Sequence, residues 1–190
     1  SDLGYEVHGW YQGMNRGPRK GVLARMQEQL TAVHRDAKEP VSLIGWSLGG
    51  VYAREMAKVA PKSVRNVITL GTPFSHGPRS TNAWRVYSAL SGESLPDEMM
   101  LRQVSAAPPV PFTSVYSKID GVVAWPASIQ KPDADNENIE NIEVFASHLG
   151  IGANPAAWFA IADRLAQPHG TWQPFAPPMT ARFLFGATGR

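Results

Sequence analysis

The segment that most constrains the fold of this chain is residues 40–50, an apolar run that breaks into Gly-X-Ser-X-Gly and then becomes helical. Its first five residues are typical of a strand that is covered on both faces. Apolar residues at helical spacing follow the motif, and Pro61 ends that helix. This order of strand, serine and helix predicts a nucleophile elbow, the sharp turn that exposes a reactive serine, with Ser47 at its tip.

Glycines flank the serine of this motif on both sides. A strand and a helix that are joined by so sharp a turn nearly touch, so small residues are needed there. Gly45 and Gly49 are expected to meet that need. The alternative is an ordinary serine in a glycine-rich turn, and the strand and helix around it count against that interpretation.

Strands alternate with helices along most of the chain. Strands are predicted at residues 3–10, 40–44, 64–70, 111–116 and 139–145, and helices at residues 21–38 and 154–167 in addition to the helix after Ser47. Such alternation indicates a mostly parallel α/β sheet with flanking helices. A length of 190 residues with 43% hydrophobic residues fits a single globular domain over residues 1–190.

Two segments depart from this alternation. Residues 74–111 contain several prolines and two apolar helical pieces but no strand pattern, which predicts a helical cap over the carboxyl ends of the strands, where α/β sheets bind ligands. A helical excursion packed on the edge of the domain is the alternative. Residues 169–190 are rich in proline, glycine and aromatic residues, and they are expected to form an irregular tail.

Composition excludes several classes of function. A net charge of +2 is too small to indicate a nucleic-acid-binding surface. The absence of cysteine excludes disulfides, thiol catalysis and cysteine-ligated zinc or iron–sulfur sites. No apolar run is long enough to predict a transmembrane segment. No signal-peptide pattern opens the chain, which favours the cytoplasm, although the first residue is not methionine. The oligomeric state does not follow from the sequence.

A serine hydroxyl becomes a strong nucleophile only when a base takes its proton and a third group orients that base. In sheets of this type the acid and then the histidine follow the serine, on loops after later strands. Asp120 follows the fourth predicted strand, and Gly121 permits a tight turn beside it. His148 follows the fifth. The sequence therefore predicts a catalytic triad of Ser47, Asp120 and His148.

Other acids and histidines compete for these roles. The rival acids are Asp133, Asp135 and Glu137 in an acidic loop, and Glu140 and Glu143 within a strand pattern. The rival histidines are His8 and His34, which precede the serine, His76 at the entrance of the cap, and His169 after the last helix. Chain order counts against His8, His34 and His76 as the base, and His76 is instead a candidate for lining the substrate pocket.

These residues resemble the α/β-hydrolase superfamily, and more narrowly its bacterial lipase- and esterase-like members. The resemblance rests on residues 43–55, 67–74, 116–123 and 147–148, and it runs from about residue 5 to residue 167. It implies the α/β-hydrolase fold and a hydrolase that needs no metal or organic cofactor. It also implies that residues 71–74 line the mouth of the pocket, so Thr72 and Phe74, together with Trp46 beside the serine, are candidates for substrate binding.

The resemblance is incomplete at the amino terminus. Members of the superfamily carry an earlier strand whose loop donates one of the two backbone N–H groups of the oxyanion hole. Only a few residues precede the first predicted strand here, so an amino-terminal truncation is expected, with an open edge and an apolar groove beside the nucleophile strand. The backbone N–H of Leu48 is then the one oxyanion donor that the sequence predicts.

The expected reaction is hydrolysis of a carboxylic ester through an acyl-serine, with a small-molecule ester or a lipid as substrate and no nucleic-acid partner. Two alternatives remain open. One is an acyltransferase or thioesterase with the same triad. The other is a catalytically silent, hydrolase-like binding module, because a fold does not guarantee a function.

Overall fold

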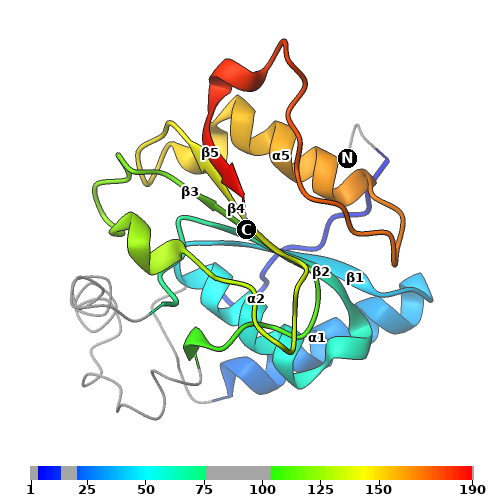
Figure 1. Ribbon diagram of the computed structural model, residues 1–190. Coiled ribbons are helices and arrows are strands. Elements are labelled where there is room, and N and C mark those ends of the chain that lie inside the picture. The colour runs from blue at the N-terminus through cyan, green and yellow to red at the C-terminus, as the bar shows by residue number, and fades with distance from the viewer. Residues whose placement is uncertain (1–3, 14–20, 76–103, 190) are drawn as a thin grey trace.

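The computed structural model describes residues 4–13, 21–75 and 104–189 (Figure 1). These residues contain a five-stranded sheet with the order β1-β2-β3-β4-β5. The strands are β1 (Val41–Trp46), β2 (Val64–Leu70), β3 (Phe112–Tyr116), β4 (Ile139–Val144) and β5 (Phe185–Gly189). Neighbours from β1 to β4 are parallel and β5 is antiparallel to β4, so the predicted mostly parallel sheet is confirmed. Most of the predicted cap, residues 76–103, lies outside the described residues.

Helices pack on this sheet in two separate apolar cores. Helices α1 (Val22–Ala37) and α2 (Leu48–Val59) join the core that contains Val67, and helix α5 (Pro155–Ala166) joins the core that contains Ile68. Because successive side chains of a strand point to opposite faces, these adjacent residues show that the sheet is covered on both. Short 3-10 helices occur at Pro61–Ser63, Trp125–Ser128, Ile151–Ala153 and Arg182–Leu184. None of the described helices could span a bilayer.

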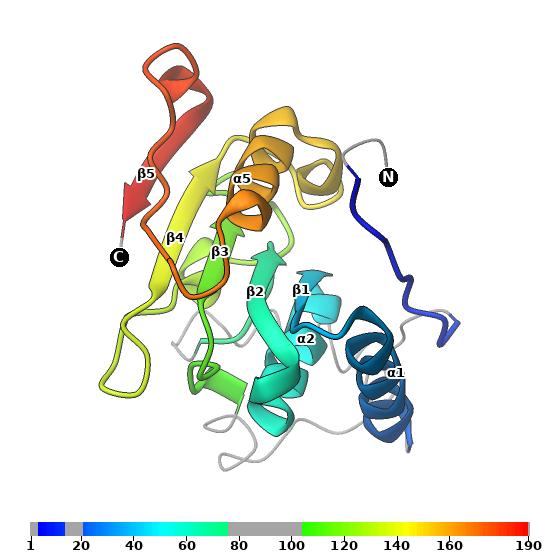
Figure 2. The same ribbon diagram turned by 90° about the vertical axis from the view of Figure 1, so that its right-hand side faces the viewer.

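Parallel pairing brings the carboxyl ends of β1, β2, β3 and β4 to the same end of the sheet (Figure 2). Trp46 pairs with Leu70 at the end of β1 and β2, and Tyr116 pairs with Glu143 at the end of β3 and β4. The loops that follow β1, β3 and β4 therefore begin at the same end of the sheet, with β2 between β1 and β3. These are the loops that carry Ser47, Asp120 and His148.

The predicted strand at residues 3–10 is wrong. Residues 5–11 have no regular secondary structure and pair with no strand of the described sheet. Two of their contacts are with helices. The carbonyl of Gly9 accepts a hydrogen bond from Gln29 of α1, and the Trp10 ring lies 5.3 Å from that of Tyr52 of α2. Strand β1 consequently forms one edge of the described sheet, and its Ile44 is 48% exposed.

The carboxyl-terminal segment is more ordered than the irregular tail that its composition predicts. It returns to the sheet as β5, and Phe175 and Phe185 are buried with ring centroids 5.0 Å apart. Buried Glu140 fixes the path of this segment: one carboxylate oxygen accepts from Arg164 Nη1 at 2.7 Å, and the other accepts from the Phe175 N–H at 2.6 Å. A hydrogen bond from Thr113 Oγ1 completes the partners of Glu140.

Removing this carboxylate should destabilise the fold. We expect Glu140→Ala to lower the free energy of unfolding by about 3–5 kcal/mol, because the 3%-exposed Arg164 would lose its buried ion-pair partner and keep only the more exposed Asp163. Glu137→Ala, on the exposed loop before β4, is the control and should change stability by less than about 0.5 kcal/mol. Urea unfolding of the two variants measures the difference. Equal effects would show that the buried pair does not hold the tail.

Candidate active site

Ser47 occupies a strained turn between β1 and α2. Its backbone has φ 52° and ψ −126°, a conformation that residues with a side chain rarely adopt. The Ser47 N–H donates to the carbonyl of Leu70 at 2.8 Å, which ties the turn to the end of β2. A Cβ at Gly45 would lie 2.4 Å from the Cα of Gly50, so strand and helix meet as closely as the elbow requires.

The second glycine of the motif does not have the role that the sequence predicts. A Cβ at Gly49 would meet no heavy atom within 4 Å, whereas a Cβ at Gly50 would lie 2.1 Å from Thr72 Oγ1. The close approach on the helix side is therefore at Gly50, against the loop after β2. Spacing within the motif could not reveal this contact, because it depends on where Thr72 packs.

The three predicted side chains form one hydrogen-bonded chain. His148 Nε2 lies 3.0 Å from Ser47 Oγ, and His148 Nδ1 lies 2.8 Å from Asp120 Oδ2. With the proton of the neutral imidazole on Nδ1, the ring donates to the carboxylate and accepts from the serine hydroxyl. This arrangement can move a proton from Ser47 to His148 while Asp120 holds the ring.

Asp120 is kept ionised by its hydrogen bonds. Burial raises the pKa of this 5%-exposed carboxyl, but hydrogen bonds from the His148 ring and from two backbone N–H groups lower the pKa by more. The two backbone donors are Val123, at 2.6 Å, and Val122, at 2.9 Å, both to Oδ1. The pKa of Asp120 therefore lies below its ordinary value of 3.8.

Two further residues shape the loops that carry Asp120 and His148, and sequence reasoning missed the roles of both. Ser117, which is 1% exposed, accepts hydrogen bonds at Oγ from the N–H groups of Ile119 and Ala146, so it joins the two loops. Gly71 lies under the pair at φ 52°, and a Cβ there would be 2.9 Å from Asp120 Oδ2. The place of Gly71 directly after a predicted strand was the only signal for its role.

Comparisons with known proteins agree with this architecture. The family model described as the PGAP1-like alpha/beta domain matches residues 21–107, somewhat less than half of the chain. The esterase domain of a Rhodothermus marinus protein is 15% identical, with a TM-score of 0.54 over 82% of this chain and 71% of that one. A lipase-esterase related protein from Clostridium acetobutylicum is 14% identical, with a TM-score of 0.52 over 83% and 78%. Rv0554 from Mycobacterium tuberculosis is 18% identical, with a TM-score of 0.54 over 76% and 72%.

This chain has the α/β-hydrolase fold. The fold predicted from the resemblance is thus confirmed. A comparison with curated protein sequences gives no match. At these identities the structural likeness shows the fold alone.

Within this α/β-hydrolase fold, two of the predicted substrate contacts are instead core residues. Thr72 and Phe74 are 0% exposed. Phe74 packs edge-on against Phe112, with ring centroids 5.4 Å apart, so a substrate could not reach it without disrupting the core. Thr72 and Phe74, in the described part of the loop after β2, thus support the elbow from within the core. The predicted contact His76 lies outside the described residues.

The ring of Phe74 also packs against a buried cation. The guanidinium of Arg54, a 0%-exposed residue of α2, lies 3.8 Å from the centroid of the Phe74 ring. Its Nη2 donates to the carbonyl of Ala106 at 2.9 Å and to Gln130 Oε1 at 2.8 Å. Burial lowers the pKa of Arg54 to about 9, although Glu55 opposes the shift. Arg54 thereby anchors the chain that leads into β3 onto the helix that follows Ser47.

Trp46 and Leu48, on either side of the serine, are placed differently. The indole of Trp46 is turned toward the base and donates from Nε1 to the carbonyl of His148 at 3.0 Å. Leu48 is the first residue of α2, so its N–H has no acceptor within its own helix and is available to an oxyanion beside Ser47.

The rival acids and histidines have other partners. Glu140 binds Arg164, Glu143 binds Lys118, His8 contacts Glu6, and His34 contacts the carbonyl of Glu39. Asp133 accepts from the backbone of its own loop, in which Asp135 and Glu137 are exposed. No group of three or more His, Asp or Glu side chains in the described parts of the chain could hold a metal ion.

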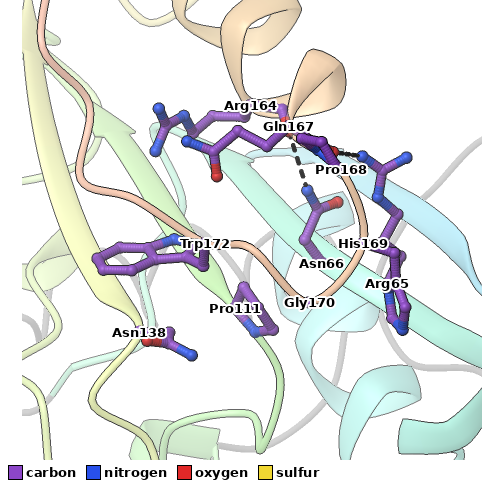
Figure 3. A pocket seen from close by; sticks show the side chains of 10 residues that line it. All are labelled: Arg65, Asn66, Pro111, Asn138, Arg164, Gln167, Pro168, His169, Gly170 and Trp172. Atoms are coloured by element: carbon purple, nitrogen blue, oxygen red, sulfur yellow. Dashed lines mark hydrogen bonds between the residues drawn. The ribbon is translucent and has the colours of Figure 1, made fainter.

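The last rival, His169, lines a cavity of about 220 Å³ at the opposite edge of the sheet (Figure 3). Residues at the start of β2, before β3 and before β4 contribute to it, among them Asn66, Pro111 and Asn138. Its arginines are already engaged, since Arg65 Nη2 donates to carbonyls at the end of α5 and Arg164 is held by Glu140. The cavity is therefore separate from Ser47, and both of its arginines already donate hydrogen bonds to other groups of the protein.

The two helix glycines allow a matched test of the elbow. We expect Gly50→Ala to lower the free energy of unfolding by about 1–3 kcal/mol, because the new methyl group would overlap Thr72 in a closed core. Gly49→Ala should be neutral or stabilise the protein by up to about 1 kcal/mol, because the site is open and alanine favours helix. Thermal or urea unfolding measures the stability of both variants. A larger loss of stability in Gly49→Ala than in Gly50→Ala would contradict the assigned contact.

The hydrogen bonds of Asp120 predict a pH dependence of stability. Because its pKa is lower in the folded protein than in the unfolded chain, its contribution is fully present above the ordinary value of 3.8 and is lost as the pH falls through the folded value. We expect the difference in unfolding free energy between the wild type and Asp120→Asn to shrink at acid pH. Urea titrations over a pH series measure it, and a difference that grows on acidification would exclude the assigned hydrogen bonds.

Proposed function

We propose that this chain is a serine hydrolase that cleaves carboxylic esters through an acyl-serine intermediate. The observation that carries the proposal is the continuous hydrogen-bonded chain from Asp120 through His148 to Ser47, with the serine at a strained turn. Each member has the chemistry that its position requires: an ionised acceptor, an imidazole with one nitrogen toward each neighbour, and a hydroxyl.

In the first half of the reaction, Ser47 Oγ attacks the ester carbonyl carbon as its proton passes to His148 Nε2. The carbonyl oxygen becomes an oxyanion, and the Leu48 N–H at the positive end of α2 stabilises it. Asp120 remains ionised and stabilises the imidazolium. The tetrahedral intermediate then collapses: the C–O bond to the alcohol breaks, the alcohol takes the proton from His148, and an acyl-serine remains.

In the second half, water replaces the alcohol. His148 removes a proton from the water as its oxygen attacks the acyl carbon, and a second tetrahedral intermediate forms. This intermediate collapses with transfer of the proton back to Ser47 Oγ, which releases the carboxylic acid. A single oxyanion-hole donor contributes about 10²–10³ in rate, so Leu48 accounts for a large part of the expected catalysis.

The surroundings of the three side chains favour an apolar ester. Each of the three residues has an exposed apolar neighbour in the sequence. These neighbours are Trp46 beside Ser47, Ile119 beside Asp120 and Leu149 beside His148, and they are 44%, 65% and 77% exposed. Apolar side chains around a small number of polar groups are typical of sites that bind small molecules or acyl chains.

Ester hydrolysis tests the proposal. We expect the wild type to hydrolyse p-nitrophenyl butyrate, and Ser47→Ala and His148→Ala each to lower kcat by at least about 10³-fold. Because the two residues act as one unit, the double variant should lose little more than either single variant. His169→Ala, at the far edge of the sheet, is the control and should retain full activity.

The chain length and type of the substrate are varied in the same assay. p-Nitrophenyl acetate, butyrate and palmitate, with a butyryl thioester, separate short-chain esterase, lipase and thioesterase activity. Hydrolysis that survives in Ser47→Ala, or a wild type that hydrolyses none of these compounds, would contradict the proposed function.

A further inference from the structure

We infer that Trp46 is a positioning residue that fastens the catalytic base to the nucleophile elbow. This inference rests on the proposed function, because it assigns a role within the same site. Its indole Nε1 donates to the backbone carbonyl of His148 at 3.0 Å, across 102 positions of sequence. Trp46 is bonded covalently to Ser47, so the residue next to the nucleophile holds the residue that activates it.

The backbone of His148 is held at both of its polar groups. Its N–H donates to the carbonyl of Asp120 at 2.8 Å, and its carbonyl accepts from Trp46. The two ring nitrogens are held in the same way, since Nδ1 contacts Asp120 and Nε2 contacts Ser47. His148 therefore has one main-chain and one side-chain attachment to the acid loop, and one of each to the elbow. Two attachments to the elbow fix an orientation that one alone would leave free to rotate.

The loop that carries His148 is anchored in the core on both sides of the histidine, since Ala146 and Ile151 are 8% and 0% exposed. Leu149, the residue directly after His148, is 77% exposed. Packing thus fixes the path of the loop, and the hydrogen bonds of His148 set the orientation of the imidazole relative to Ser47. A displacement of about 1 Å between reacting groups can lower a rate by about 10²-fold, so an attachment from the elbow affects the reaction directly.

The indole ring adds a second effect. The Trp46 and His148 rings lie 5.4 Å apart between centroids, at an angle of 37°. An indole attracts a nearby cation, and the imidazole becomes a cation only after it has taken the serine proton. The contact therefore stabilises the transition state more than the ground state, and its loss should lower kcat rather than raise KM.

Two substitutions separate these effects. Trp46→Phe keeps an aromatic ring and removes the N–H donor, and it should lower kcat for p-nitrophenyl butyrate by about tenfold with KM unchanged. Trp46→Leu removes the ring as well, so kcat should fall further.

A matched control is available on α5. Trp158 donates from Nε1 to the carbonyl of Gly152 at 2.8 Å, so Trp158→Phe deletes the same kind of bond without touching His148. Its kcat and KM should equal those of the wild type. If Trp46→Phe also behaves as the wild type, or if it raises KM with kcat unchanged, the inference is overturned and Trp46 is a substrate contact or a surface residue.

The outcomes for the two proposals are distinct. A wild type without esterase activity, or one matched by Ser47→Ala, overturns the proposed function itself. If Trp46→Phe does not fold, the rate at which the wild-type indole Nε1–H exchanges with D₂O tests the hydrogen bond to His148 instead. Exchange at least tenfold slower than in a free indole supports the bond in this 44%-exposed residue, and exchange at the rate of a free indole overturns it.

Discussion

The hydrogen-bonded chain from Asp120 to Ser47 is the interaction on which the rest of the site depends. A buried carboxylate is costly unless donors surround it, and Asp120 accepts from the imidazole and from two backbone N–H groups of its own turn. Those donors keep the carboxylate ionised, and the carboxylate in turn sets the tautomer that leaves Nε2 free to accept from Ser47. The chain of hydrogen bonds thus determines both the position and the tautomer of the base.

The fold supplies the precision that these hydrogen bonds need. Parallel register places the ends of β1, β3 and β4 at one edge of the sheet, and apolar cores on both faces keep these ends in place. Local contacts then complete the arrangement: Gly50 lets α2 approach Thr72, Ser117 joins the acid and base loops, and Gly71 leaves room beneath them. Buried Arg54 and the Glu140–Arg164 pair secure the segments that lead away from the sheet.

Much of the fold and of the candidate site follows from the sequence because both depend on chain order. The alternation of strand and helix patterns predicted the parallel sheet, and the serine between a strand and a helix predicted the elbow. The loops after later strands predicted which side chains lie within hydrogen-bonding distance of Ser47 and of one another. What the sequence could not supply was distance between elements. The misassigned role of Gly49, the burial of Thr72 and Phe74, and the parts of Gly71 and Ser117 all depend on how closely one loop packs on another. The apparent strand at residues 3–10 has a strand-like composition but pairs with no strand in the described part of the sheet, and β5 depends on the distant carboxylate of Glu140.

Chemical labelling of the serine tests the central claim most directly. A fluorophosphonate reacts with a serine only when a neighbouring base activates it, so treatment of the full chain followed by peptide mapping identifies the nucleophile. The account predicts one adduct, on Ser47, that is absent from His148→Ala and forms far more slowly in Asp120→Asn. An adduct on another residue, no adduct at all, or equal labelling of Ser47 in His148→Ala would contradict it.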